Sequence, residues 1–381
     1  MSAQLIHTSH SQLRKFAMSN NPVVIGVVAH PTTETEGGSD TGPPKFVTGS
    51  EYIAASYIKW LEQAGARVIG VPFSATREET ELLFKQMNGV LFPGGATELG
   101  GSARTLYALA EASNAAGDFL PVWGTCLGFQ WLMQLGARNE SDVLCLGCFD
   151  SMNLENKLDL TAAAATSRLF GSLSSAERSL VAAEKVTFNN HHDGVTPEAF
   201  AADAGLAANW TILSTNQGRQ GKVYVSTVEH RTRPYYGIQW HAEKSQFEFY
   251  PSHVNHSADA TALSNSMAKF FIGEARRSRP PPTPYEVEDG TTTIYTGGLP
   301  VSHRMLPSFQ SIVLVKGAEA TTIAPLWIVL AVMGVVILAM VAVALWRFAA
   351  ALRRRDDERL VSVQSKAEER PGALVVAGDA A

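Results

Sequence analysis

One cysteine, Cys126, lies between two glycines in the stretch Pro121–Gln130, which reads PVWGTCLGFQ. An apolar strand, a G-x-C-x-G turn and a helix form the cysteine version of the nucleophile elbow, in which a strained turn presents the reactive side chain. Gly124 and Gly128 let the strand and the helix approach closely. Helix-terminal N–H groups and the helix dipole favour a thiolate over a thiol. We therefore predict that Cys126 is a nucleophile rather than a buried structural cysteine.

A histidine and a carboxylate follow a second apolar stretch, far downstream in the chain. His241 and Glu243 come directly after Gly237–Trp240, a predicted strand. Their i, i+2 spacing places both side chains on the same side of an extended chain. His241 can accept the thiol proton and later protonate a leaving amine, while Glu243 holds its tautomer and stabilises the imidazolium. An H-x-E tripeptide alone is weak evidence, but together with Cys126 it predicts a cysteine hydrolase.

A glycine-rich turn follows another predicted strand. Phe92–Gly95 reads FPGG, and such a turn can aim backbone N–H groups into a cleft at the carboxyl ends of the strands. The N–H groups of Gly95 and Leu127 are the predicted oxyanion hole. Without the cysteine elbow the same turn would indicate only a tight loop.

Short apolar strands alternate with amphipathic helices through the first part of the chain. Pro22–Ala29 has the β-branched, unalternating pattern of a strand buried on both faces, and Ser50–Ala64 has the pattern of an amphipathic helix. The alternation continues to Leu127–Leu135 and includes a capping box formed by Thr76 and Glu79. This order predicts an α/β fold, a three-layer sandwich with a mostly parallel central sheet.

The later segments predict a sheet that becomes mixed. Lys222–Glu229 and Tyr235–Trp240 have the pattern of paired strands, and Ala260–Arg277 has the pattern of a helix. After the proline-rich breaker that follows this helix, Thr291–Tyr295 and Ser311–Val315 are predicted edge strands.

Composition narrows the class of protein. The chain has 381 residues, a formal net charge of -5 and no clustered basic stripe, so nucleic acid is not an expected partner. Three cysteines are too few for a disulfide framework. Cys145 and Cys148 form a lone CxxC, which we interpret as two ordinary small apolar residues rather than a redox or metal pair.

A long uncharged stretch near the C-terminus predicts a transmembrane helix. Leu326–Trp346 contains 21 residues without a charge, enough to cross the hydrocarbon core. The predicted organisation is a polar segment and a catalytic domain, then a stalk, the helix and a tail, with bounds 1–20, 21–315, 316–325, 326–346 and 347–381.

Arginines on the C-terminal side of that stretch predict a cytosolic tail, which makes the protein single-pass with a lumenal or extracellular catalytic domain. Sequons at Asn139, Asn209 and Asn255 are weak support for glycosylation on that side. Residues 1–20 lack the apolar stretch of a signal peptide. Either a segment upstream is missing, which we favour, or the catalytic domain is cytosolic.

These motifs resemble the γ-glutamyl hydrolase family, peptidase family C26, within the class I glutamine amidotransferase-like superfamily. The resemblance runs from about Pro22 to about Val315 and rests on EYIAASYIKWLEQAGARV at 51–68, GVLFPGGATEL at 89–99, FLPVWGTCLGFQWL at 119–132, YYGIQWHAEKSQFEF at 235–249, IYTGGL at 294–299 and SFQSI at 308–312. It implies hydrolysis of γ-linked polyglutamate tails, as on folylpoly-γ-glutamates, with Cys126 as nucleophile, His241 as base and acid, and Glu243 as the third member. A lysosomal, vacuolar or secreted location would suit a lumenal domain, and a homodimer is a compatible assembly.

Position matching within the resemblance also implies that His191 and Tyr57 face the glutamyl end of the substrate. The adjacent His192 leaves the first of these assignments open. Two positions depart from the family pattern: Ala242 stands where proline is usual, and Gln130 stands where glutamate is common. Neither departure removes a catalytic group.

Two alternatives remain beside the hydrolase. Gln130 recreates the C-x-G-x-Q pattern of glutamine amidotransferases, whose glutamine helps to hold a substrate glutamine. An amidotransferase would need a synthase domain or subunit to receive ammonia, and no second enzymatic domain is encoded here. A catalytically silent membrane-anchored binding protein is the other, because a fold alone does not assign activity. The predicted reaction calls for no metal and no organic cofactor.

Overall fold

The structure of the protein is a computed structural model, and it describes residues 23–31, 49–249, 252–278, 300–306, 309–317, 340–341 and 345–347. The chain divides into two compact units, Met1–Ala318 and Glu319–Ala381. The fold and the candidate site described below belong to the first unit.

Within the described residues the central sheet has eight strands, in the order β4-β1-β5-β6-β12-β11-β10-β8. Their bounds are β4 Ala66–Val71, β1 Val23–Val28, β5 Gly89–Phe92, β6 Val122–Thr125, β12 Tyr235–Ile238, β11 Val223–His230, β10 Trp210–Gln217 and β8 Asp159–Leu160. Neighbours from β4 to β12 pair in parallel, and those from β12 to β8 pair antiparallel. The predicted mostly parallel sheet that becomes mixed is therefore confirmed.

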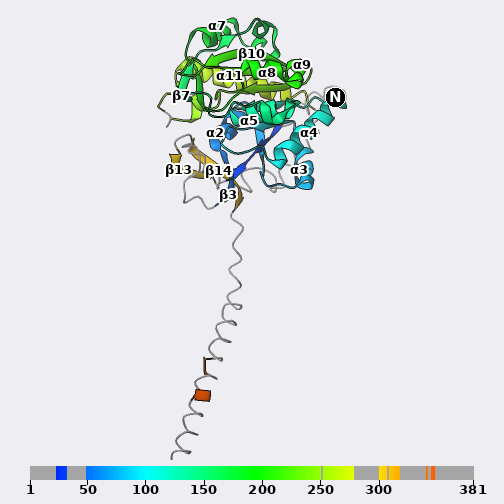
Figure 1. The fold of residues 1–381 in the computed structure, drawn as a ribbon, viewed down its shortest axis with the longest axis vertical. Coiled ribbons are helices and arrows are strands. Elements are labelled where there is room, and N and C mark those ends of the chain that lie inside the picture. The colour runs from blue at the N-terminus through cyan, green and yellow to red at the C-terminus, as the bar shows by residue number, and fades with distance from the viewer. Residues whose placement is uncertain are drawn as a thin grey trace, which may run out of the picture. The chain divides into compact units, whose positions relative to one another are not determined.

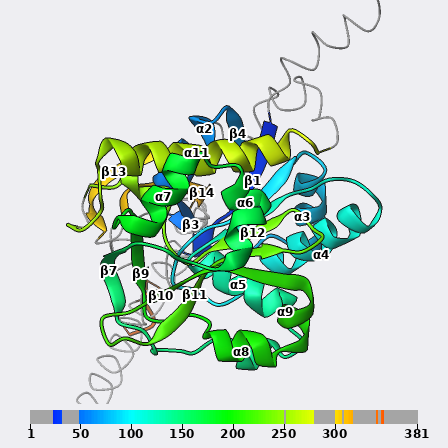
Figure 2. The same cartoon turned by 90° about the horizontal axis from the view of Figure 1, so that it is seen from above.

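Helices cover both faces of this sheet. Strand β1 buries Val23, Ile25 and Val27 in one core and Val24 and Val28 in the other, because successive strand residues point to opposite faces. The first core includes residues of α2 Ala55–Glu62, α7 Ser175–Ala183 and α11 Ala258–Ala275. The second includes residues of α3 Arg77–Phe84, α4 Gly101–Ala115, α5 Leu127–Gly136 and α9 Ala204–Asn209. Figure 2 shows α2 and α11 on one side of the strands and α5 and α9 on the other.

Shorter elements connect these layers. They are the helices α6 Arg168–Gly171, α8 Pro197–Ala202 and α10 Lys244–Phe247, the 3-10 turns η1 Glu140–Asp142 and η2 Ala162–Thr166, and the paired strands β7 Ser151–Asn156 and β9 Thr187–His191. The predicted capping box is present: Thr76 Oγ1 accepts from the Glu79 N–H, and the Glu79 carboxylate accepts from the Thr76 N–H.

The predicted helix Ser50–Ala64 is wrong in its first part. Residues Gly49–Ala54 form strand β3, and helix α2 begins only at Ala55. Strand β3 pairs antiparallel with β14 Phe309–Gly317 on one side and with β2 His30–Pro31 on the other. A partner so distant in the sequence overrides the local helical pattern, as tertiary context often does.

This second sheet has four strands among the described residues, in the order β13-β14-β3-β2, with β13 spanning Pro300–Leu306. Figure 1 shows β13, β14 and β3 side by side. Ser311–Val315 lies within β14, so the predicted strand is confirmed, but its predicted edge position is wrong because β14 pairs with both β13 and β3. The other predicted edge strand, Thr291–Tyr295, lies outside the described residues.

The predictions of a transmembrane helix at 326–346 and of a single-pass membrane location are corrected. Among the residues that the structure describes, no helix is both long enough and apolar enough to cross a membrane. The long helix α11 has 18 residues, and it carries Asp259, Lys269 and Glu274 and packs on the sheet. Of the stretch 326–346, the described residues are Met340, Val341, Leu345 and Trp346. The membrane anchor and the location inferred from it are withdrawn.

Candidate active site

Cys126 occupies a strained turn between β6 and α5. Its backbone φ of 53° and ψ of -106° place it in a region that residues with a side chain rarely adopt. The Cys126 N–H donates to the Ile238 carbonyl at 2.8 Å, and the Cys126 carbonyl accepts from the Gln130 N–H at 3.1 Å. Both ends of the turn are thus fixed, by the neighbouring strand β12 and by the first turn of α5.

The nearest atoms to the two glycines of the elbow are backbone atoms. A Cβ at Gly124 would lie 2.4 Å from the Gly128 carbonyl oxygen, and a Cβ at Gly128 would lie 1.9 Å from the Phe92 carbonyl oxygen. Backbone cannot move aside as the end of a flexible side chain can. Only glycine therefore allows β5, β6 and α5 to approach this closely, as the spacing of the motif predicts.

Replacing Gly128 by alanine is expected to lower the free energy of unfolding by about 3 kcal/mol or more, because the added methyl overlaps the Phe92 carbonyl. The measurement is urea unfolding followed by circular dichroism. Gly273→Ala is the matched control, since Gly273 lies in helix α11, where an added methyl would have nothing within 4 Å. Alanine there is expected to be neutral or stabilising by up to about 1 kcal/mol. Equal midpoints for the two variants would contradict the close approach.

His241 lies just beyond the carboxyl end of β12, beside the elbow. Strands β12 and β6 are parallel neighbours, with Ile238 opposite Thr125, so residues that follow them leave the sheet at the same edge. The His241 N–H donates to the Phe188 carbonyl of β9 at 2.8 Å and fixes the backbone. Its Nδ1 lies 2.6 Å from Glu243 Oε1, and both side chains are buried. This contact places the ring proton on Nδ1 and leaves Nε2 with a lone pair that can accept a proton.

Gly94 is the point where the reactive side chains converge. A Cβ placed there would lie 2.7 Å from Tyr57 Oη, 2.9 Å from His241 Cε1 and 3.2 Å from Cys126 Cβ. The Gly94 N–H donates to Tyr57 Oη at 2.8 Å, and this hydroxyl lies 3.4 Å from His241 Nδ1. Helix α2, the β5 turn, the elbow and the segment after β12 therefore meet around one residue without a side chain.

Burial decides the resting charge state of the thiol. Desolvation and the Glu243 carboxylate raise the pKa of Cys126 to about 12, although the Leu127 N–H and the Lys244 ammonium oppose this. The predicted resting thiolate is therefore not what the structure favours: the helix terminus stabilises the thiolate, but burial costs it more. Burial lowers the pKa of His241 while Glu243 opposes the shift, so a neutral thiol faces a neutral imidazole.

Glu243 remains ionised in this buried setting. Burial raises the pKa of its carboxyl, but the His241 ring, a hydrogen bond to that ring and the Lys244 ammonium together hold it below its usual range. A charged carboxylate beside the ring is the arrangement that stabilises an imidazolium once His241 has taken a proton.

The two predicted oxyanion-hole residues lie differently. The Leu127 N–H lies close enough to the Cys126 sulfur to lower the pKa of its thiol. The Cα of Gly95 lies against a buried histidine, since a Cβ there would lie 2.7 Å from His30 Nε2. Gly94, rather than Gly95, is the glycine in contact with Cys126.

His191 and Gln130 hold the same backbone carbonyl from two sides. His191 Nδ1 donates to the Asp193 carbonyl at 2.8 Å, and Gln130 Nε2 donates to it at 3.0 Å. His191 is buried and its Nε2 has no hydrogen-bond partner, whereas His192 is exposed. The structure thus directs His191, and not His192, toward the interior beside His241. Burial lowers the pKa of His191, and the nearby His241 lowers it further.

Lys244 is a residue of the site that the sequence pattern did not single out. Its side chain is buried, with Nζ 5.9 Å from the centre of the Phe188 ring, and its charge lowers the pKa values of Cys126 and Glu243. The sequence signal that could have identified it was a lysine directly after the H-x-E tripeptide. Its burial could not be read locally, because lysine is usually exposed.

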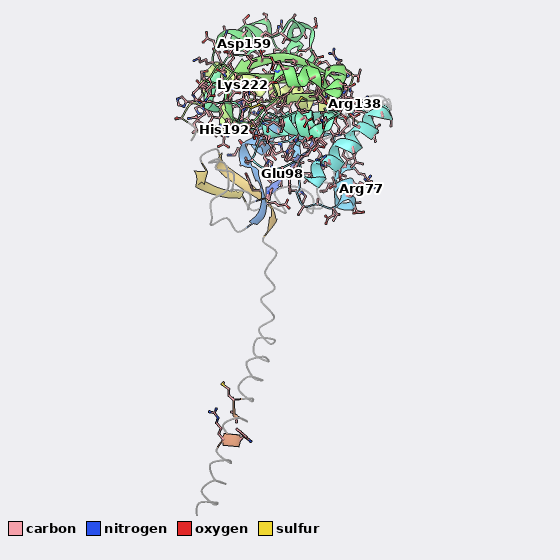
Figure 3. The ribbon with its side chains drawn as sticks, viewed as in Figure 1. Arg77, Glu98, Arg138, Asp159, His192 and Lys222 are labelled. Atoms are coloured by element: carbon pink, nitrogen blue, oxygen red, sulfur yellow. A yellow bond between two sulfur atoms is a disulfide. The ribbon has the colours of Figure 1, made fainter. Side chains whose placement is uncertain are left out.

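The interpretation of Cys145 and Cys148 as ordinary apolar residues is wrong, because the structure joins them by a disulfide with a Cα–Cα distance of 5.5 Å. The intervening Gly147 has a φ of 63°, which permits the tight turn. The bridged loop docks on the segment after β9: Phe149 N–H donates to the His192 carbonyl, and Gly147 N–H to Asp193 Oδ1. The Nζ of Lys222 lies 3.2 Å from Cys145 Sγ. Lys222 and His192 are both labelled in Figure 3.

Comparison with known proteins identifies several relatives. The family model described as Peptidase C26 matches residues 23–243. Human gamma-glutamyl hydrolase is 37% identical over 237 residues, which cover 60% of this chain and 73% of the human protein. Gamma-glutamyl hydrolase B of Dictyostelium discoideum is 31% identical over 275 residues, 70% of this chain and 76% of that protein. Gamma-glutamyl hydrolase 1 of Arabidopsis thaliana is 33% identical over 262 residues, 67% and 72% of the two chains.

Proposed function

Because this chain belongs to the peptidase C26 family and is a γ-glutamyl hydrolase, we propose that it cuts the γ-linked bonds of polyglutamate tails such as those of folates, using Cys126. The single observation that carries the residue assignment is the convergence of Cys126, His241 and Tyr57 around Gly94. The expected homodimer has no supporting observation among the described residues and is not part of the proposal.

The first half of the reaction forms a thioester. Cys126 Sγ attacks the γ-carbonyl carbon of the substrate as His241 Nε2 takes the thiol proton, because both groups are neutral at rest. The carbonyl oxygen becomes an oxyanion beside the Leu127 N–H. His241 then gives its proton to the departing amine nitrogen, and the C–N bond breaks. A γ-glutamyl thioester on Cys126 and a shortened amine product result.

The second half returns the enzyme to its starting state. His241 takes a proton from water, whose oxygen attacks the thioester carbonyl. The C–S bond breaks, the sulfur regains the proton and the γ-glutamyl carboxylic acid leaves. In both halves the charged Glu243 stabilises the imidazolium through the 2.6 Å contact with Nδ1.

His191 is the proposed recognition group for the glutamyl end. Because its Nδ1 donates to Asp193, its Nε2 carries a lone pair that can accept a hydrogen bond. The α-amide N–H of the substrate glutamate is a donor that would satisfy this buried acceptor. Gln130 supports the same wall by holding the Asp193 carbonyl and by donating to Gln239 Oε1 at 3.3 Å. Tyr57 lines the site from α2.

Incubation of the full chain with a pteroyl penta-γ-glutamate is expected to give shortened γ-glutamyl products, resolved by mass spectrometry. The same peptide with α-linkages is the matched control and is expected to remain uncut. L-Glutamine is the competing substrate: ammonia release without chain shortening would instead favour an amidotransferase-like glutaminase. No turnover of either compound would favour a silent binding protein.

A further inference from the structure

His30 is a buried histidine that the proposed reaction does not use. It follows β1 at the carboxyl end of the central sheet, and only 3% of its surface is exposed. Among the described residues, neither of its ring nitrogens has a hydrogen-bond partner. A buried polar group without a partner destabilises the folded protein. Packing alone would be served as well by phenylalanine, so the two nitrogens need a different explanation.

The ring of His30 lies directly against the turn that follows β5. A Cβ at Gly95 would lie 2.7 Å from its Nε2, 2.8 Å from Cε1 and 3.0 Å from Cδ2, so the backbone of Gly95 covers one side of the ring. The backbone groups of Pro93 and Gly94 are close enough to favour its charged form. They nevertheless fall short of hydrogen-bond geometry with either nitrogen. Burial outweighs them and lowers the pKa of His30 to about 4, so the neutral ring carries one N–H.

A second unpartnered group lies beside the first. Trp131, in α5, is buried with its indole Nε1 lacking an acceptor, and its ring centre is 5.6 Å from that of His30. A small rotation of the imidazole would let one nitrogen accept from the Trp131 N–H while the other donates to the turn. The tryptophan would then determine which nitrogen of His30 keeps the proton.

Peptide geometry connects His30 to the oxyanion. In a planar trans peptide the carbonyl and the following N–H point in opposite directions. If the Gly94 carbonyl faces His30, the Gly95 N–H points away from His30. Gly94 itself lies against Cys126, so an N–H that points away from His30 can face the side of the turn on which Cys126 would form the oxyanion. The Gly94 N–H is held by Tyr57 Oη, which leaves this peptide plane as the adjustable part of the turn.

We propose that His30 is a positioning residue for the oxyanion hole: its N–H holds the Gly94 carbonyl, which aims the Gly95 N–H at the oxyanion formed on attack by Cys126. The inference rests on the proposed function, since it needs a tetrahedral adduct on that sulfur. The contact tightens as negative charge appears, because the adduct fixes the peptide plane in the orientation that His30 stabilises. His30 itself touches no substrate atom.

Kinetics of His30→Phe test the proposal. Phenylalanine keeps the shape of the ring and removes the donor, so kcat is expected to fall about 10- to 100-fold with KM nearly unchanged, as for an interaction made only in the transition state. His30→Gln carries an amide donor and is expected to recover most of kcat. Ser214→Ala is the matched control, because it removes a buried hydroxyl that also lacks a partner but lies in β10. It is expected to retain wild-type kcat.

Binding of a γ-glutamyl aldehyde gives a readout independent of turnover. The aldehyde forms a tetrahedral adduct with a cysteine thiol, and His30→Phe is expected to weaken its binding about 10- to 100-fold while leaving the affinity for the hydrolysis product unchanged. Equal kcat and aldehyde affinity in His30→Phe and wild type would overturn the role of His30. Equal losses of kcat and aldehyde affinity in His30→Phe and His30→Gln would show that His30 acts only through packing. Absence of wild-type turnover would instead count against the proposed function.

Discussion

Cys126→Ala is expected to lower kcat for γ-glutamyl hydrolysis by about 10⁴- to 10⁶-fold, the loss typical of removing a covalent nucleophile. Alanine removes the sulfur that forms the thioester but leaves the oxyanion hole and the substrate-binding groups in place. Mass-resolved analysis of products from the γ-linked substrate measures the rate. Trapping with acid during turnover is expected to reveal a γ-glutamyl adduct on the wild-type protein and none on the variant.

Cys126→Ser separates the loss of the nucleophile from a disturbed elbow. Serine fits the same strained backbone, and it too is expected to lose nearly all turnover, since a hydroxyl is a weaker nucleophile than a thiol at this position. Both variants should keep the unfolding midpoint of the wild type, because the hydrogen bond from the Cys126 thiol to the Asn190 carbonyl is long, at 3.9 Å. Normal turnover in either variant would place the nucleophile elsewhere.

His241→Ala is expected to lower kcat by about 10³- to 10⁵-fold, because the buried thiol then has no base. The pKa of Cys126 of about 12 makes this dependence strong: few molecules carry a thiolate at neutral pH unless a neighbour takes the proton. The residual rate of the variant is expected to rise with pH as hydroxide ionises the thiol. A wild-type rate in His241→Ala, or a pH-independent residual rate, would contradict the assignment.

Two matched variants accompany this experiment. Glu243→Gln keeps the size of the third residue but replaces its charge, so it removes the stabilisation of the imidazolium and is expected to cost less than His241→Ala. His253→Asn removes a histidine on the exposed surface, bonded to Ser252, and is expected to retain full turnover. A loss in His253→Asn equal to that in His241→Ala would point to a nonspecific effect.

Local sequence patterns were sufficient to predict the first strand and the elements around Cys126. The apolar run of β1, buried on both faces, and the strand, turn and helix around Cys126 lie where the pattern predicts. The role of the glycines at 124 and 128 could be predicted for the same reason, because the residues that bring strand and helix close together are near one another in the chain. The pairing of His241 with Glu243 was also predicted, but the two side chains meet across a turn, since Glu243 has helical backbone angles, and not along an extended chain.

Contacts between distant segments were decided by the tertiary structure alone. Strand β3 replaces the first turn of a predicted helix because β14 pairs with it from far along the chain. The meeting of α2, the β5 turn and the elbow at Gly94 has no local signal, nor has the packing of His30 under Gly95.

Amino-acid sequence by itself determined the family of this protein and the residue types that we propose carry its chemistry. The tertiary structure decided which histidine of His191 and His192 faces inward, which glycine meets Cys126, and that Lys244 is buried. It also decided the charge of the thiol, because desolvation of Cys126 depends on every layer packed around it, whereas the helix dipole that favours a thiolate depends only on the next turn of chain.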